Sequence, residues 1–153
     1  MSTNSPLGRL AALGLQLPPV TAPLAAYVPA VRSGNHVYVS GQLPIVDGAL
    51  VTTGKVGDSV SVEQATGLAR RCALNALAAV DALVGLDQVT QVVKVVGFVA
   101  SAAGFTGQPE VVNGASELFG AVFADAGRHA RSAVGVAELP RGAPVEVDVI
   151  FEV

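Results

Sequence analysis

Residues 61–85, which read SVEQATGLARRCALNALAAVDALVG, decide the fold class, because they predict one long helix with both ends defined. Ser61 and Gln64 have the spacing of a capping box, and Gly85 is a typical helix stop. Between these ends, apolar side chains recur at helical spacing: Val62, Ala65, Ala69, Cys72, Ala76, Val80 and Leu83. Most of them are small, so we expect this helix to pack closely onto a sheet.

The strand predicted next, over Val89–Ala100, is apolar on both faces. Alternation divides its side chains into two sets: Val93, Val95 and Val99 on one face, and Val92, Val96 and Phe98 on the other. Both faces should therefore be buried. Because the predicted helices cover only one of them, we expect a neighbouring subunit to cover the other.

Two further helices are predicted. Ser5 is a good N-cap, Pro6 suits a first helical position and Gly14 a stop, so a short helix should begin the chain before a Pro-rich connector. A second long helix is predicted over Pro109–Phe123, ending before Gly127. Its expected inward side chains are Val111, Val112, Ala115, Leu118, Phe119, Val122 and Phe123.

The remaining strands are predicted as two hairpins. Ala25–Val31 and His36–Ser40 should pair across residues 32–35, and Arg131–Leu139 and Val145–Val153 across residues 140–143. A short extra strand is expected around Leu50–Thr52. The element order predicts an α+β fold, in which a mixed sheet carries two long helices on one face, plus the short N-terminal helix.

The last strand alternates between two kinds of side chain. One face is apolar and belongs to the core: Val145, Val147, Val149 and Phe151. The other face is mostly acidic: Glu146, Asp148, Ile150 and Glu152. A polar sheet face beside a subunit boundary is a place where we expect a functional site.

Length and composition limit the class of protein. The 153 residues fit a single domain, 1–153, with residues 1–24 forming the N-terminal helix and connector. The net charge is −3, and Arg70–Arg71 is the only adjacent pair among nine scattered Lys and Arg residues, which disfavours nucleic-acid binding. A lone cysteine, Cys72, and the absence of a signal-peptide or membrane-span pattern favour a cytoplasmic protein.

General catalytic and cofactor motifs are absent from the sequence. It has no phosphate-binding loop, no dinucleotide fingerprint and no nucleophile elbow. His36 and His129 are the only histidines, and we expect them to face solvent rather than to bind a metal. Neither a metal nor a cofactor is therefore predicted.

Several motifs share a recognisable order. The run HARSAVGVAELP, His129–Pro140, precedes the strand that carries Glu146. Upstream lie Tyr27 in the triplet AYV, the run SGQLP at residues 40–44, and Asn113 shortly before ELF. In this order and spacing the motifs resemble the RidA/YjgF family, also labelled endoribonuclease L-PSP, over all of the chain except its N-terminal helix and connector.

This resemblance implies a chorismate-mutase-like subunit in a homotrimer, with sites in the clefts between neighbours. The family's deaminases hydrolyse reactive 2-imino and enamine acids, such as 2-aminoacrylate, to 2-oxoacids and ammonia without a cofactor. The implied partners are therefore a small imino or oxo acid and further copies of the chain, and not a membrane.

The resemblance also implies residue roles. Arg131 would bind the substrate carboxylate through two parallel hydrogen bonds, which its planar guanidinium allows. Glu146 would activate water and relay a proton. Further substrate contacts are implied at four positions: Tyr27, Ser40, Asn113 and Ala133. Ala133 departs from the family, because many of its deaminases have cysteine there.

Each role has a structural alternative, and so does the function. The alternative for Arg131 is a strand arginine paired with Glu152 or another hairpin carboxylate, and the alternative for Glu146 is a solvated strand residue. Without the cysteine at Ala133, the chain is either a deaminase or a cofactor-free module that binds small carboxylates or ketoacids without turnover. A third function, endoribonuclease or translation inhibitor, is disfavoured by the acidic pI of about 5.2.

Overall fold

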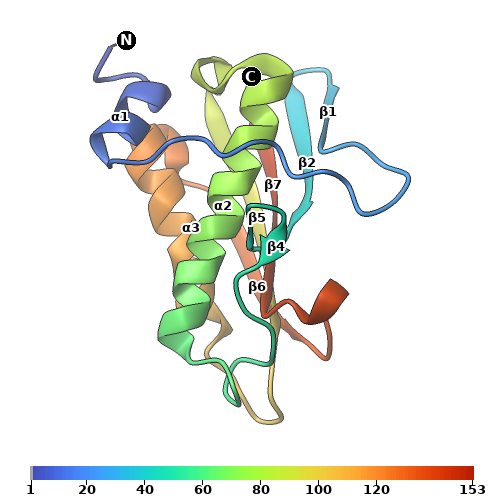
Figure 1. Cartoon of the computed structure of the whole chain (residues 1–153). Coiled ribbons are helices and arrows are strands. Elements are labelled where there is room, and N and C mark those ends of the chain that lie inside the picture. The colour runs from blue at the N-terminus through green and yellow to red at the C-terminus, as the bar shows by residue number, and fades with distance from the viewer. Residues whose placement is uncertain (1) are drawn as a thin grey trace.

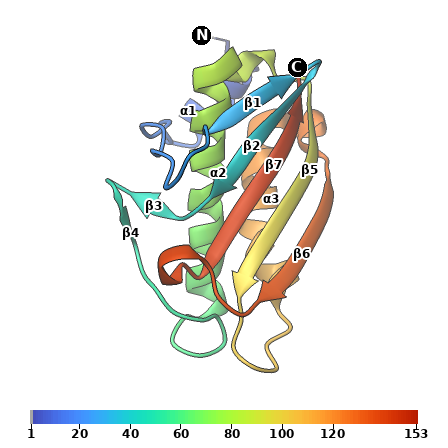
Figure 2. The same ribbon diagram turned by 90° about the vertical axis from the view of Figure 1, so that its right-hand side faces the viewer.

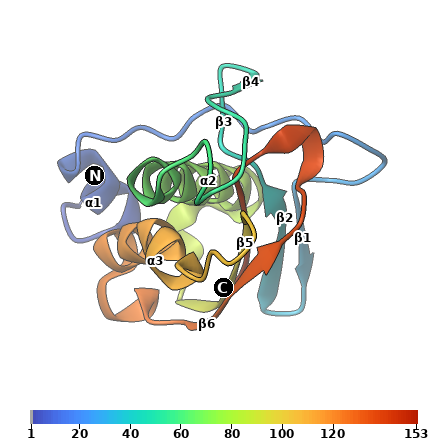
Figure 3. The same cartoon turned by 90° about the horizontal axis from the view of Figure 1, so that it is seen from below.

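The computed structural model describes residues 2–153, in which a five-stranded mixed sheet carries three α-helices on one face (Figure 1). The strands run across the sheet in the order β1 (Ala30–Ser33), β2 (His36–Gln42), β7 (Val145–Glu152), β5 (Gln91–Ala100) and β6 (Ala130–Val136). The helices are α1 (Pro6–Ala12), α2 (Val62–Val84) and α3 (Gln108–Phe123). Figure 2 shows the opposite face of the sheet without a covering helix, and Figure 3 shows the two layers end-on. The predicted fold class is confirmed.

The long helix α2 begins and ends as its sequence predicts. Gln64 Oε1 accepts a hydrogen bond from Ser61 N at 2.9 Å, and Gln64 N donates to Ser61 Oγ at 3.1 Å, which completes the capping box. Gly85 follows the last turn with φ +90°. The small apolar stripe is buried except at its two ends, Val62 and Leu83. Small side chains therefore let α2 lie close to the sheet.

The other two helices are also confirmed. Ser5 caps α1 by accepting a hydrogen bond from Gly8 N at 3.1 Å, and α1 places the buried Leu10 in the main core beside α3. Helix α3 starts at Gln108, one residue earlier than predicted, and all of its expected inward side chains are buried.

The predicted division of β5 into two faces is wrong at its start. The register against β7 shifts between Val92 and Lys94, so a bulge interrupts the alternation. Val92 is fully buried on the helix-covered face with Val95 and Val99, whereas Val93 is only half-buried. On the uncovered face, Val96 and Phe98 are half-buried in the single chain: they belong to the set that we expected a neighbour to cover.

The first hairpin is shorter at one end and tighter at its turn than predicted. Ser33 pairs with His36, so the turn is Gly34-Asn35, with φ +59° at Gly34. Residues 25–29 lie outside the sheet. Instead of a single strand around Leu50–Thr52, the following loop contains a two-stranded hairpin, β3 (Ile45–Val46) and β4 (Ala49–Leu50).

The predicted terminal hairpin is wrong, because β6 and β7 do not pair. Strand β5 lies between them, parallel to β6 and antiparallel to β7. The helix α3 joins β5 to β6, and such a crossover returns the chain parallel to the strand it left. Strand β6 ends at Val136 and is an edge strand, so Leu139 lies beyond it.

Side chains of α2 hold the loop that follows β2. Asn75, which is 1% exposed, donates from Nδ2 to the carbonyls of Leu43 and Ile45, both at 3.1 Å. Arg71 Nε donates to the same Ile45 carbonyl at 3.0 Å. These bonds fix the loop at the end of β2, beside the acidic face of β7. None of the helices in residues 2–153 has the length and hydropathy needed to cross a lipid bilayer.

Candidate functional site

The predicted site residues separate into two groups on opposite faces of the sheet. Arg131 is paired with Val95, which faces the helices, and Glu146 is paired with Phe98 on the uncovered face. Cross-strand partners share a face, and positions 95 and 98 alternate to opposite faces. Arg131 and Glu146 therefore cannot meet within one chain.

The first group, the arginine half-site, consists of Arg131, Asn113, Ser116 and Ala133. Arg131 Nη1 donates to Asn113 Oδ1 at 2.7 Å and to Ser116 Oγ at 3.3 Å, and Nη2 donates to the carbonyl of Pro109 at 3.4 Å. Strand β6 supplies the guanidinium and α3 supplies its acceptors. Ala133 shares this face of β6, because it is paired with Gly97, next to Val112 of α3.

The guanidinium of Arg131 has N–H groups left to bind a ligand, and no carboxylate neutralises its charge within residues 2–153. Its three hydrogen bonds leave the Nε–H and one Nη2–H without a partner within residues 2–153. All three acceptors are neutral oxygens, and Arg131 forms no ion pair within the same residues, where the salt bridge present is Lys55–Glu138. The alternative pairing of Arg131 with Glu152 is absent from this structure. Such a group can bind an anion.

His129 extends the arginine half-site and was missed as a participant. We expected it to face solvent, but it is half-buried, with Nε2 2.9 Å from Ser116 Oγ and Nδ1 2.6 Å from the carbonyl of Gly127. Its ring packs edge-on against Phe119, with centroids 6.1 Å apart. No local pattern indicates this contact, because α3 and the loop before β6 come together only in the folded chain.

The second group, the carboxylate half-site, consists of Glu146, Gly41, Gln42 and Tyr27. It lines a cavity of about 50 Å³ between β7, the end of β2 and the connector. The other lining residues are mostly apolar: Thr21, Ala22, Pro23, Leu24, Pro29, Leu43, Ile45 and Pro140. Gly41 is necessary for this arrangement, because a methyl group at that position would collide with the carboxylate of Glu146.

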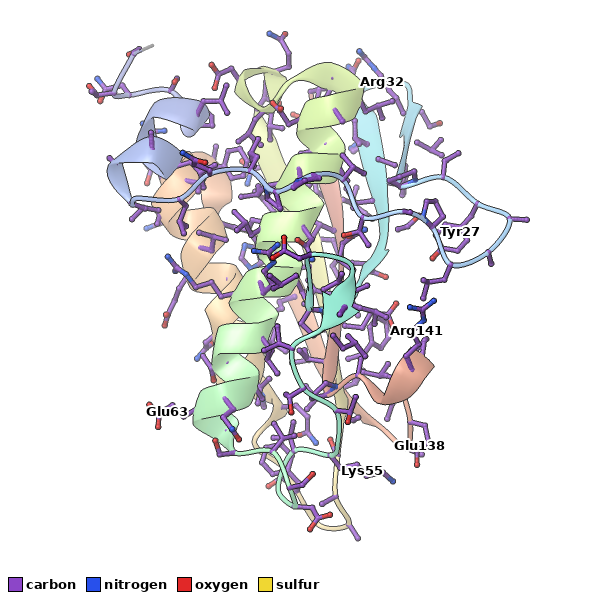
Figure 4. All side chains as sticks on the ribbon, viewed as in Figure 1. Tyr27, Arg32, Lys55, Glu63, Glu138 and Arg141 are labelled. Atoms are coloured by element: carbon purple, nitrogen blue, oxygen red, sulfur yellow. The ribbon has the colours of Figure 1, made fainter. Side chains whose placement is uncertain are left out.

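Residues 25–29, which follow the connector, are fastened to β2 at this cavity. Ser40 Oγ donates to the carbonyl of Val28 at 2.6 Å, and Ser40 N donates to that of Pro29 at 2.9 Å. Tyr27 Oη accepts from Leu24 N at 3.3 Å. Figure 4 shows Tyr27 and Arg141 on the same side of the molecule. Tyr27 thus lines the cavity as a substrate contact would, whereas the Ser40 hydroxyl is occupied by the backbone and does not line the cavity.

The surroundings of Glu146 and of the neighbouring Asp148 raise the pKa of both carboxyl groups. Burial raises the pKa of Glu146, and the nearby Asp148 raises it further. Burial also raises the pKa of Asp148, although Lys94 opposes this change. A carboxyl group in this state accepts and releases a proton closer to neutral pH than an exposed one does. The half-site is therefore suited to proton transfer.

The fold and the two half-sites together indicate the class of protein: an α+β domain with helices on one face of its sheet, and with an arginine and a glutamate on opposite faces. The family model described as Endoribonuclease L-PSP matches residues 19–153. The chain therefore belongs to this family, the RidA/YjgF family, and the predicted resemblance is confirmed.

Similar proteins carry different names. Protein TCP17 of Trypanosoma cruzi is 48% identical over 151 residues, which cover 95% of this chain and 94% of that protein. A 2-iminobutanoate/2-iminopropanoate deaminase of Dermatophagoides farinae is 34% identical over 138 residues, covering 89% and 92%. Among solved structures, the protein Atu1372 of Agrobacterium tumefaciens, of unknown function, is 46% identical with a TM-score of 0.89, covering 99% and 93%.

Proposed function

We propose that this chain hydrolyses reactive 2-imino and enamine acids to 2-oxoacids and ammonia, in clefts between the subunits of a homotrimer. Each cleft pairs the arginine half-site of one subunit with the carboxylate half-site of the next. The two groups have complementary chemistry, a charged anion-binding group and a proton-transferring acid. The relative named as a 2-iminobutanoate/2-iminopropanoate deaminase supports the choice of reaction.

The uncovered sheet face supports the assembly. Val31, Tyr38 and Val134 on this face are 50%, 49% and 42% exposed, although they are large and apolar. The half-buried Phe98 extends this surface between Val134 and Glu146, its register partners on either side. Exposed apolar side chains on both sides of the acidic row of β7 are typical of an interface between copies of a chain. A neighbour on this face would also bring a foreign Arg131 toward Glu146.

The observation that carries the proposal is the unneutralised guanidinium of Arg131. In the proposed complex, Nε–H and the remaining Nη2–H donate to the two oxygens of the substrate carboxylate, side by side. Neutral acceptors on α3 hold Nη1, so the ligand-binding edge keeps its orientation without losing charge. The bound carboxylate of the substrate in turn directs the C=N carbon of the substrate toward the facing subunit.

Glu146 transfers protons in the proposed reaction. Its carboxylate takes a proton from a water molecule as the water oxygen attacks the C=N carbon, and then delivers that proton to the nitrogen. Glu146 then moves the hydroxyl proton of the resulting carbinolamine to its nitrogen, and ammonia leaves as the C–N bond breaks and the oxygen becomes a carbonyl. An enamine substrate first gains a proton on its carbon and loses one from its nitrogen, which converts it to the imine. A raised pKa helps Glu146 in both directions of transfer.

A subunit-mixing experiment tests the proposal. Arg131→Ala and Glu146→Gln subunits are denatured, mixed in equal amounts and refolded, and the loss of enzymatically generated 2-aminoacrylate is followed. Each variant alone should be inactive. Random mixing should restore roughly a quarter of the sites. A cleft is intact only when a Glu146→Gln subunit supplies its arginine and an Arg131→Ala subunit supplies its glutamate.

The controls separate assembly from chemistry. Unmixed variants treated in the same way report refolding without complementation, and sedimentation reports the trimer. Activity of the mixture that does not exceed that of the two unmixed variants would contradict the shared cleft. Full activity of the Arg131→Ala variant would contradict the chemistry itself.

Ala133 favours a second candidate, a binding module without turnover, because it provides no thiol beside Arg131. Titration of the wild-type chain with 2-oxobutyrate distinguishes the two. Binding that depends on Arg131, together with no acceleration of imine loss, would favour the module over the hydrolase.

A further inference from the structure

We propose that Ser116 and His129 are positioning residues for Arg131, which orient its guanidinium for the substrate carboxylate through a relay of three hydrogen bonds that starts at the Gly127 carbonyl. This inference rests on the proposed function, because it assigns to Arg131 a ligand-binding role. It adds two residues for which the family motifs gave no role.

The relay begins at a fixed carbonyl. Gly127 is buried, and a side chain at this position would collide with the backbone of Phe119, so the turn before β6 is tightly packed against α3. Its carbonyl oxygen can only accept a hydrogen bond, and it lies 2.6 Å from His129 Nδ1. The imidazole proton therefore resides on Nδ1. In the neutral ring, Nε2 is left as an acceptor.

The next member of the relay after His129 is the hydroxyl of Ser116. At 2.9 Å, Ser116 Oγ–H donates to His129 Nε2, which fixes the rotation of the hydroxyl. The oxygen lone pairs are then available to Arg131 Nη1 at 3.3 Å. The edge-on contact of His129 with the fully buried Phe119, at an interplanar angle of 86°, holds the imidazole in place.

With the relay in place, Arg131 Nη1 donates to two acceptors, Asn113 Oδ1 and Ser116 Oγ. Asn113 and Ser116 are three residues apart on α3, so they share one helix face. Both accept from Arg131 Nη1, which uses both of its N–H groups. Loss of the Ser116 contact leaves the guanidinium with the Asn113 bond and the long 3.4 Å bond from Nη2 to the Pro109 carbonyl, which hold its plane less firmly. The Nε and Nη2 edge would then lose its fixed direction.

Ser116→Ala should raise KM for the imine, and the Kd for 2-oxobutyrate, by about tenfold, the equivalent of one hydrogen bond to a charged group. The kcat should change little, because the carboxylate contact is the same in the ground state and in the transition state. Ser116→Thr, which keeps the hydroxyl, should restore both constants.

Two variants of His129 form a matched pair. His129→Asn can still donate to the Gly127 carbonyl but cannot reach Ser116, whereas the longer His129→Gln can accept from the Ser116 hydroxyl. The Asn variant should therefore weaken binding and the Gln variant should retain most of it. The Ser116→Ala/His129→Asn double variant should be no weaker than either single variant, because both break one relay.

Arg131→Ala, measured in parallel, distinguishes a failure of the relay from a failure of the proposed function. If Arg131→Ala abolishes binding and turnover while Ser116→Ala leaves KM and Kd unchanged, the proposed function stands and the relay is overturned. Additive effects in the double variant also overturn it. If Arg131→Ala changes nothing, the proposed function fails, and the relay fails with it. Circular dichroism of each variant reports folding.

Discussion

The two half-sites differ in what holds their charged groups. In the arginine half-site, hydrogen bonds donated to neutral oxygens fix a guanidinium that keeps its charge. In the carboxylate half-site, an apolar cavity and an adjacent acid make the charge of Glu146 less favourable, which raises its pKa. The first arrangement suits a permanent binding contact, and the second suits a group that must gain and lose a proton.

The difference follows from where each group lies in the sheet. Arg131 is on the edge strand β6, where one helix can supply several side-chain acceptors. Glu146 is on β7, an interior strand beside the connector and the loop after β2. Both side chains are half-buried in the single chain. The same sheet therefore provides a hydrogen-bonded cation on one face and a partly desolvated acid on the other.

The largest effect is expected from changes that remove the paired hydrogen bonds of Arg131. Arg131→Ala should lower kcat/KM roughly 100-fold or more, because two hydrogen bonds to a charged group contribute about 1.5–3 kcal/mol each. Arg131→Lys keeps the charge but not the planar pair of donors, so it should recover only part of the loss. Steady-state kinetics of both variants, with 2-aminoacrylate generated in the assay, measure this difference.

The comparison with lysine sharpens the assignment of the arginine half-site. Full recovery with lysine would mean that charge alone matters, and the directional role of Asn113 would have to be abandoned. Asn113→Ala should show the same pattern as Ser116→Ala, namely a raised KM with a similar kcat, because both residues act on Nη1.

A smaller effect is expected from Gly41→Ala, which tests the carboxylate half-site without removing a functional group. The added methyl would displace the carboxylate of Glu146, the flexible end of a side chain, so the cost in folding should be low. A misplaced proton-transfer group should lower kcat on the order of tenfold, with little change in KM. Gly67→Ala on α2, where open space surrounds the new methyl, is the matched control. Equal kcat values for the two variants would show that the position of Glu146 does not limit the reaction.

The helices could be predicted because their signals are local. The capping box at Ser61, the N-cap at Ser5 and the apolar spacing of α3 depend on residues within a few positions of one another. The bulge at Val92 and the placement of β5 between β6 and β7 depend on pairing between distant segments. Sequence adjacency therefore suggested a hairpin that does not form.

The site was predictable to a similar extent. Arg131 and Glu146 stand in motifs, so their candidacy could be read from the sequence. Their positions on opposite faces could not, because the faces follow from the register of three strands. The contact of His129 with Ser116 joins a loop to a helix, and no spacing rule connects residues that meet in this way.

The smallest expected effect is the dependence of stability on pH that arises from the raised pKa of Glu146. Burial, together with Asp148, raises the pKa of Glu146 above its ordinary 4.5. The folded chain then binds more protons than the unfolded chain between the ordinary and the raised pKa, so stability should be full below that window and decline as the pH rises through it. Glu146→Gln should flatten this decline and raise the urea midpoint at neutral pH. Glu117→Gln, at an exposed carboxylate of α3, should leave the decline in place. A decline that persists unchanged in Glu146→Gln would mean that Asp148, whose pKa burial also raises, is its main source.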